Sequence, residues 1–173
     1  MYDSAYIDYL AHLHGTRDYF ECHELLEERW KRDLPLKKDA ILVGFIQYAV
    51  SLYHYRRNNY EGAIRTLEKA MTIFSEKESE IQEYGIDSPH FQRKLTELFQ
   101  TMKSKKPYKS INIPLSDPIL IEKVKKRCLE LNCTFGDQSN LQDKLLVHKH
   151  KKRDRTEVIQ ERLQSLQKKT KAK

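Results

Sequence analysis

The stretch AILVGFIQYAVSLYHYRR, residues 40–57, determines how the rest of the chain must be arranged. Its apolar side chains occur on nearly every side of a helix rather than along one stripe. A helix of this kind is buried in the core of a protein, where its neighbours cover it. The sequence therefore predicts a central helix over about residues 39–57, with Asp39 as its N-cap.

Small and polar side chains interrupt this apolar helix along one side. At about 100° per residue, Ala40, Gly44, Gln47, Ser51 and His54 fall within one narrow stripe. Polar groups that are buried between helices require polar partners. We expect the stripe to face a polar group of side chains on the preceding helix.

The stretch DYFECHELLEERW, residues 18–30, supplies such a group. His23, Glu27 and Trp30 recur at the spacing i, i+4 and i+7, so they project from one mostly apolar face of a helix. An isolated carboxylate buried there would cost on the order of several kcal/mol, so Glu27 must be protonated, hydrogen-bonded, paired with a cation or coordinated to a metal. Glu24, at the edge of this face, can also turn inward.

The whole chain has the composition of a helical protein. Only five glycines and five prolines interrupt segments rich in Leu, Lys, Glu, Gln and Arg, which favours helix over sheet. We expect an all-α fold in three parts. The expected parts are a helical bundle over 1–104, a strap and an additional helix over 105–140, and a basic extension over 141–173. The apolar positions of the extension are too sparse for a core face, so we expect a helix detached from the bundle.

Turn and capping residues mark the ends of the expected helices. Gly15 is a candidate C-terminal cap for the first helix, and Asn58 and Asn59 form the turn before the fourth. Ser88 is a candidate N-cap with Pro89 in the first turn, and the next helix begins at 117–118. Helices are therefore predicted over about 3–14, 16–31, 40–57 and 58–77, from 88, and from 117 to 131.

The positive formal charge of +7 comes from the C-terminal extension. Residues 144–173 contain 11 Lys and Arg against 3 acidic residues, whereas residues 1–143 contain 21 against 22. The extension is therefore a candidate for contact with a polyanion, through counterion release, or with a protein. The plainer interpretation is a solvated terminal helix without a partner.

The sequence predicts a cytoplasmic protein that makes no membrane contact. No segment approaches 18 uninterrupted apolar residues, and the N-terminus does not read as a signal peptide. The three cysteines, Cys22, Cys128 and Cys133, lack the C-x-x-C spacing of a zinc knuckle or redox pair, so we expect reduced thiols. No glycine-rich phosphate loop occurs either, which disfavours a nucleotide-hydrolysing enzyme.

Three segments, FECHELLEERW, GFIQYAVSLYH and NNYEGAIRTLEKA, are similar to the bacterial and archaeal family catalogued as domain of unknown function 309. That family is marked by a histidine, a glutamate four residues later and an aromatic residue three further, matched here by His23, Glu27 and Trp30. The resemblance covers roughly residues 6–74. It implies a bacterial helical bundle with a suspected metal role and no established activity.

One divalent ion, Zn, Mn, Fe or Ni, is the cofactor that these residues suggest. His23, Glu27 and His54 are the candidate ligands, because imidazole nitrogen and carboxylate oxygen suit these metals. Glu24 is then a candidate catalytic base for metal-assisted hydrolysis. The string HELLE shares only its first two residues with the H-E-x-x-H motif of zinc proteases, so a protease is disfavoured.

Two interpretations without a metal remain open for the same pocket, which we expect Gln47, Ser51 and Trp30 to line. In one, a buried polar network sets the register of the helices and binds nothing. The protein is then a non-enzymatic helical adaptor that binds its partner through its surface or its basic tail. In the other, the pocket binds a small molecule, with His23 or His54 as a base that Glu27 orients.

Overall fold

The computed structural model describes residues 2–34, 37, 38, 40–152, 163, 164 and 166, and all of its elements are helical. The elements in chain order are α1 (Ser4–Ala11), η1 (His12–Thr16), α2 (Tyr19–Asp33), α3 (Ile41–Arg56), α4 (Tyr60–Glu76), α5 (Glu78–Glu83), α6 (Ser88–Lys103), α7 (Pro118–Glu130), α8 (Lys144–Val147) and α9 (Lys149–Lys152). An isolated bridge joins Ile86 to Leu115, and the described residues contain no strand. The expected all-α fold is confirmed.

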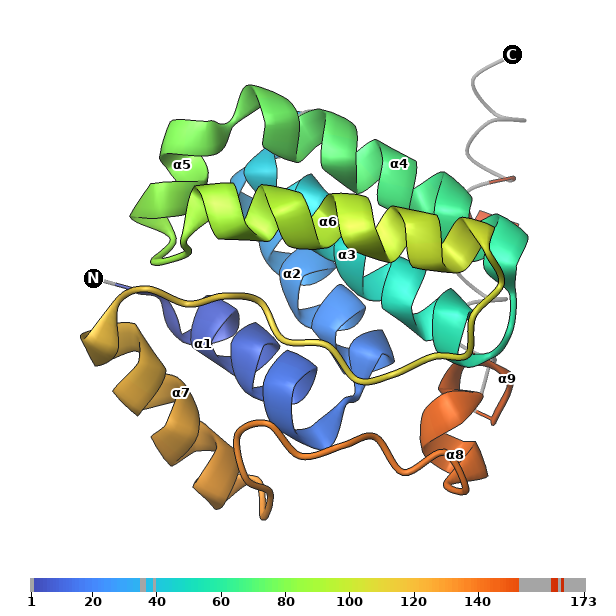
Figure 1. Ribbon diagram of the computed structural model, residues 1–173. Helices are drawn as coiled ribbons and strands as arrows, with labels where there is room; N and C mark the ends of the chain where they lie inside the picture. The colour runs from blue at the N-terminus through green and yellow to red at the C-terminus, as the bar shows by residue number, and fades with distance from the viewer. Residues whose placement is uncertain (1, 35–36, 39, 153–162, 165, 167–173) are drawn as a thin grey trace.

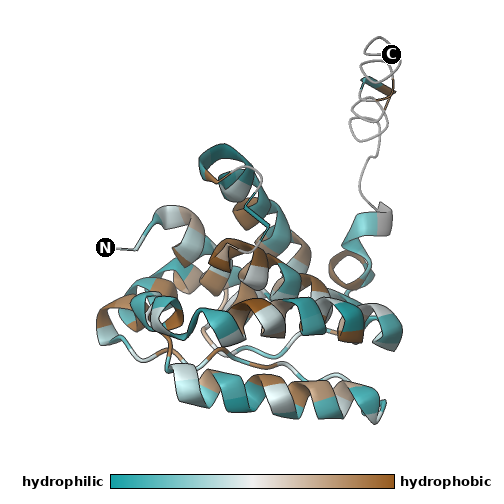
Figure 2. Ribbon diagram, turned by 90° about the horizontal axis from the view of Figure 1, so that it is seen from above, coloured by the Kyte–Doolittle hydropathy of each residue, from teal (hydrophilic) through white to brown (hydrophobic). Residues whose placement is uncertain are grey.

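Helix α3 lies in the middle of the bundle, as its all-round apolar sequence requires (Figure 1). Helices α2 and α4 pack along it, α6 packs on α4, and α1 packs on both α2 and α7. Leu42, Phe45 and Leu52 of α3 are almost completely buried. Apolar residues gather on the sides that the helices turn toward one another (Figure 2). The prediction of a buried central helix is therefore confirmed.

Aspartate side chains begin several of the helices. Asp18 accepts a hydrogen bond from the backbone N–H of Glu21 at 3.1 Å at the start of α2, and Asp117 caps α7. The cap of α6 is Asp87, whose carboxylate accepts from the N–H of His90 at 3.1 Å, so Ser88 is not the cap that the sequence indicated. The expected cap at Asp39 lies outside the described residues.

Gly15 serves close packing rather than helix termination. It lies inside the π-helical turn η1, and the left-handed residue that ends this turn is Arg17, with φ of 59°. A Cβ atom at Gly15 would lie 2.6 Å from Sγ of Cys133 and 2.9 Å from Sγ of Cys128. The glycine therefore allows the end of α7 to approach η1, and the predicted cap at Gly15 is wrong.

The strap, residues 104–117, is tied to η1 by buried polar side chains. Nε2 of His14 accepts a hydrogen bond from the backbone N–H of Ile113 at 3.0 Å. The guanidinium of Arg17 donates to Oδ1 of Asn112 at 2.7 Å, and both His14 and Arg17 are fully buried. The strap and α7 thus share one core with the bundle, and Figure 1 shows the strap running between α6 and α1.

The first part of the C-terminal extension packs on the bundle. Val147 is only 6% exposed, and the guanidinium of Arg56 donates to the carbonyl of Leu146 at 3.3 Å. Nζ of Lys149 lies 2.7 Å from Oδ2 of Asp18. The expectation of a detached extension is wrong for this part, and most of the remaining extension lies outside the described residues. No helix in the described part is long and apolar enough to cross a membrane.

Candidate functional site

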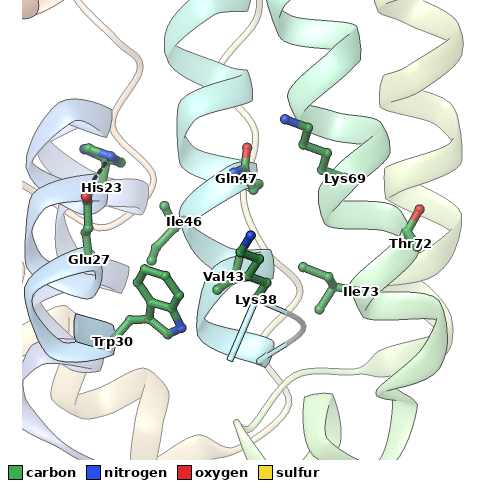
Figure 3. Close-up of a pocket in the computed structure, with 10 residues that line it drawn as sticks. All are labelled: His23, Glu27, Trp30, Lys38, Val43, Ile46, Gln47, Lys69, Thr72 and Ile73. Carbon is green, nitrogen blue, oxygen red and sulfur yellow. Dashed lines mark ion pairs between the residues drawn. The ribbon is translucent and has the colours of Figure 1, made fainter. Parts of the chain in front are cut away.

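A cavity of about 570 Å³ lies over α3, between α2 and α4 (Figure 3). Helix α3 forms its floor, while α2 and α4 form its walls. Its lining combines charged, aromatic and aliphatic side chains. The lining residues are His23, Glu27, Trp30, Lys38, Val43, Ile46, Gln47, Lys69, Thr72 and Ile73.

The side chains of His23 and Glu27 form a pair at the edge of this cavity. Nε2 of His23 lies 2.5 Å from Oε2 of Glu27, as their spacing of four residues on α2 allows. The other carboxylate oxygen of Glu27 lies 2.8 Å from Nζ of Lys31. The two side chains are 29% and 30% exposed, so water also solvates the pair. Glu27 is therefore stabilised by Lys31 and by solvent as well as by His23.

Trp30 forms one wall of the cavity and ties the end of α2 to the approach to α3. Its Nε1–H donates a hydrogen bond to the carbonyl of Lys37 at 2.9 Å. The indole also packs against the hydrophobic core. This one side chain positions both α2 and the segment that carries Lys38 into the cavity.

The small and polar stripe of α3 does not face α2 as a unit. Oγ of Ser51 donates to the carbonyl of Ala63 on α4 at 2.7 Å, and a Cβ at Gly44 would lie 2.8 Å from a ring carbon of Phe74. These small residues allow α3 and α4 to pack closely, and Ser51 lies outside the cavity. Gln47 is the member of the stripe that lines the cavity.

His54 lies in a separate, smaller cavity. This space of about 190 Å³ is also lined by His23 and by the rings of Phe20 and Tyr53. Nδ1 of His54 lies 3.2 Å from the amide nitrogen of Asn59. Burial lowers the pKa of His54, and the charges of nearby arginines lower it further. His54 is thus held neutral, away from the cavity that Glu27 lines.

The expected set of three metal ligands is not assembled in this arrangement. No group of three or more His, Cys, Asp or Glu side chains among the described residues could hold a metal ion. His23 and Glu27 supply two potential ligand atoms. Glu24, the candidate catalytic base, is exposed on α2 and is not part of the cavity lining.

Comparisons with known proteins place the chain in a family. The domain of unknown function DUF309 matches residues 6–66, which span most of α1, all of η1, α2 and α3, and the start of α4. The uncharacterized protein YpuF of Bacillus subtilis (strain 168) is 40% identical over 173 residues, covering 100% of this chain and 99% of the relative. The chain belongs to the DUF309 family. No solved structure matches this DUF309 protein.

Several cavity residues of this DUF309 protein were not expected from its sequence. They are Lys38 and the α4 side chains Lys69, Thr72 and Ile73. The α4 residues share one face because they recur at i, i+3 and i+4. That spacing could have identified them as neighbours, but it does not indicate that their face borders a cavity.

Proposed function

We propose that the cavity between α2, α3 and α4 binds a small organic anion with an aromatic or aliphatic body. One observation carries the proposal: the His23–Glu27 pair shares the lining of a cavity of about 570 Å³ with Trp30 and two lysines. A volume of this size is typical of sites for small organic molecules. Such sites combine a mostly apolar lining with a few polar groups that orient the ligand.

The lining supports a ligand with two unlike ends. Val43, Ile46 and Ile73 offer aliphatic surface, and the indole of Trp30 offers an aromatic surface. Lys69 extends from α4 toward Gln47, and Lys38 approaches from the segment before α3 (Figure 3). Neither lysine takes part in an ion pair within the described part of the chain, so both ammonium groups are available to a carboxylate or phosphate.

The His23–Glu27 pair supports hydrogen bonding or proton exchange with the ligand. Glu27 holds the Nε2 side of the imidazole, and Nδ1 has no hydrogen-bond partner in the described part of the chain. A histidine oriented by a carboxylate is a common proton donor or acceptor at neutral pH. The same two side chains could instead supply two ligands to a divalent ion, with water or the organic anion completing the coordination. Metal binding is therefore the competing proposal.

The single tryptophan of the chain makes the test specific for this cavity. The emission of Trp30 is followed while 4-nitrobenzoate, a quenching aromatic carboxylate, is added. We expect saturable quenching that Lys69→Gln weakens about tenfold, whereas Lys125→Gln on the exposed surface of α7 leaves it unchanged. The neutral analogue 4-nitrobenzyl alcohol controls for collisional quenching. Quenching that does not saturate, or that is equally strong in Lys69→Gln and in the unaltered chain, contradicts the proposal.

Zinc, manganese, iron(II) and nickel salts are titrated in the same assay without the carboxylate. A saturable change of Trp30 emission that disappears in both His23→Ala and Glu27→Gln would support the metal proposal instead. The adaptor hypothesis predicts no saturable response to either kind of ligand. It predicts further that partner binding depends on residues 144–173 and not on Glu27.

A further inference from the structure

A second, separate groove lies between α6 and the strap. Its volume is about 450 Å³. The aliphatic and aromatic parts of its surface come from Leu98, Ile111, Pro107 and the ring of Tyr55. The polar residues that line it are Lys94, Lys106, Lys109, Glu97 and Thr101. We name it the strap groove; it is independent of the cavity over α3.

The lysines around the strap groove lack carboxylate partners in the described part of the chain. Two of them still contact the fold, because Nζ of Lys94 donates to the carbonyl of Asn112 at 3.0 Å and the ammonium of Lys103 lies over the ring of Phe99. Residues 103–109 contain four lysines and no acidic residue. These lysines are exposed, and none of them, nor Lys94, forms an ion pair within the described part of the chain. Glu97 is the only carboxylate among the residues that line the groove. Like charges gathered in this way repel one another, and a bound anion would relieve that repulsion.

The backbone that carries these lysines is held firmly. Lys105 has a left-handed φ of 53°, which turns the chain out of α6. The hydroxyl of Tyr55 donates to the carbonyl of Lys106 at 2.8 Å. Tyr108 is buried, with its hydroxyl 2.5 Å from that of Tyr19. Buried neighbours therefore anchor the strap while the side chains of Lys106 and Lys109 extend into solvent.

Charge is segregated along the molecule. Residues 76–87, around α5, contain five acidic residues and one lysine, and they lie at the opposite end of α6 from residues 103–109 (Figure 1). The described start of the basic extension docks near the lysine-rich end. Arg57, directly after α3, donates to Nδ1 of His148 at 3.1 Å, and Tyr55 of α3 donates to the carbonyl of Lys106. Such an arrangement orients an approaching polyanion.

We propose that the strap groove and its lysines bind single-stranded nucleic acid. Lysines distributed along an extended strap match the regular phosphates of a polynucleotide. The accessible apolar side chains of Pro107 and Ile111 give an unstacked base a surface to cover. A protein partner fits less well, because the exposed large apolar side chains of the described residues lie outside residues 94–111.

The test measures the fluorescence anisotropy of a labelled 12-nucleotide single-stranded DNA between 50 and 200 mM KCl. In the full chain, Lys106→Gln/Lys109→Gln is compared with Lys125→Gln/Lys126→Gln on α7, which removes the same charge from another exposed surface. We expect the strap variant to bind about tenfold more weakly at 100 mM KCl, with a salt slope smaller by about 1.4. The α7 variant changes affinity less than twofold.

Four results would overturn the proposal. The first is that the unaltered chain does not bind the DNA at 50 mM KCl. The second is that the strap and α7 variants lose affinity equally, which would mean that binding depends only on the total charge of the protein. The third is that a tail variant, Lys168→Gln/Lys169→Gln, loses affinity for the DNA while the strap variant does not. Tighter binding of a duplex of the same length would overturn the assignment to single strands. Circular dichroism checks that each variant is folded, and Trp30 quenching separately reports the other cavity.

Discussion

Two polar sites of this protein, each containing a histidine, differ in how completely the protein satisfies them. At the closed joint between η1 and the strap, both ring nitrogens of His14 contact backbone groups and the side chain is fully buried. At the open pair, His23 shares Glu27 with Lys31 and water, beside a cavity. A site whose polar atoms are all satisfied internally stabilises the fold, whereas one with unused polar groups and free volume can bind something else.

The closed joint depends on arginine as much as on histidine. Arg17 is fully buried, and its guanidinium donates to the carbonyls of Leu13, Ile111 and Asp137 and to Asn112 at 2.7 to 3.0 Å. Its charge is therefore distributed over four neutral acceptors. These acceptors come from three separate segments, so the residue connects η1, the strap and the turn after α7.

Replacing Arg17 by leucine should produce the largest loss of stability. The change leaves several buried acceptors without donors, and we expect the free energy of unfolding to fall by about 4 kcal/mol. Urea denaturation followed by circular dichroism measures it. Lys31→Leu, at the open pair, is the matched control with an expected change below about 0.5 kcal/mol. Similar losses in the two variants would mean that the sites do not differ as described.

Acidification should destabilise the closed joint selectively. Burial lowers the pKa of His14 from 6.5 to about 4, so the unfolded chain takes up this proton first as the pH falls. The joint is unaffected above pH 6.5, and stability then decreases by about 3 kcal/mol as the pH approaches 4. Urea midpoints between pH 7.5 and 4.5 measure the decrease. His14→Gln should show a flatter dependence, and an equally steep one would contradict the assignment to His14.

Adding one methyl group at Gly15 should test how tightly the closed joint is packed. The new Cβ would lie within 3 Å of both Cys128 and Cys133 sulfur atoms, so Gly15→Ala should cost about 2 kcal/mol of unfolding free energy. Thermal unfolding gives the change. Double variants with Cys133→Ala should recover most of the loss, because the smaller side chain makes room. No recovery would indicate that the strain lies elsewhere.

His23→Ala should have the smallest effect on stability. Glu27 retains Lys31 and water after the change, so we expect a loss below about 1 kcal/mol in urea denaturation. Quenching of Trp30 by 4-nitrobenzoate should nevertheless weaken severalfold, as the proposed binding site requires. A loss of unfolding free energy above about 2 kcal/mol would mean that His23, like His14, mainly stabilises the fold.

Local spacing predicted the open pair better than the closed joint. His23 and Glu27 meet because residues four apart on one helix always lie close together, so their contact could be predicted from α2 alone. The partners of Arg17 are backbone groups distant in sequence, such as the carbonyl of Ile111. No pattern of side chains marks a carbonyl as an acceptor, so nothing in the sequence distinguished this arginine from an exposed one.

The sequence by itself determined the helical class, the burial of α3, most helix boundaries and the faces on which side chains lie, because these depend on periodicity and on residues near in the chain. Only the tertiary structure decided that Gly44 and Ser51 face α4 while Gln47 borders the cavity. Periodicity gives the angle of a residue around its own helix. The direction of the neighbouring helix comes from packing of the whole bundle.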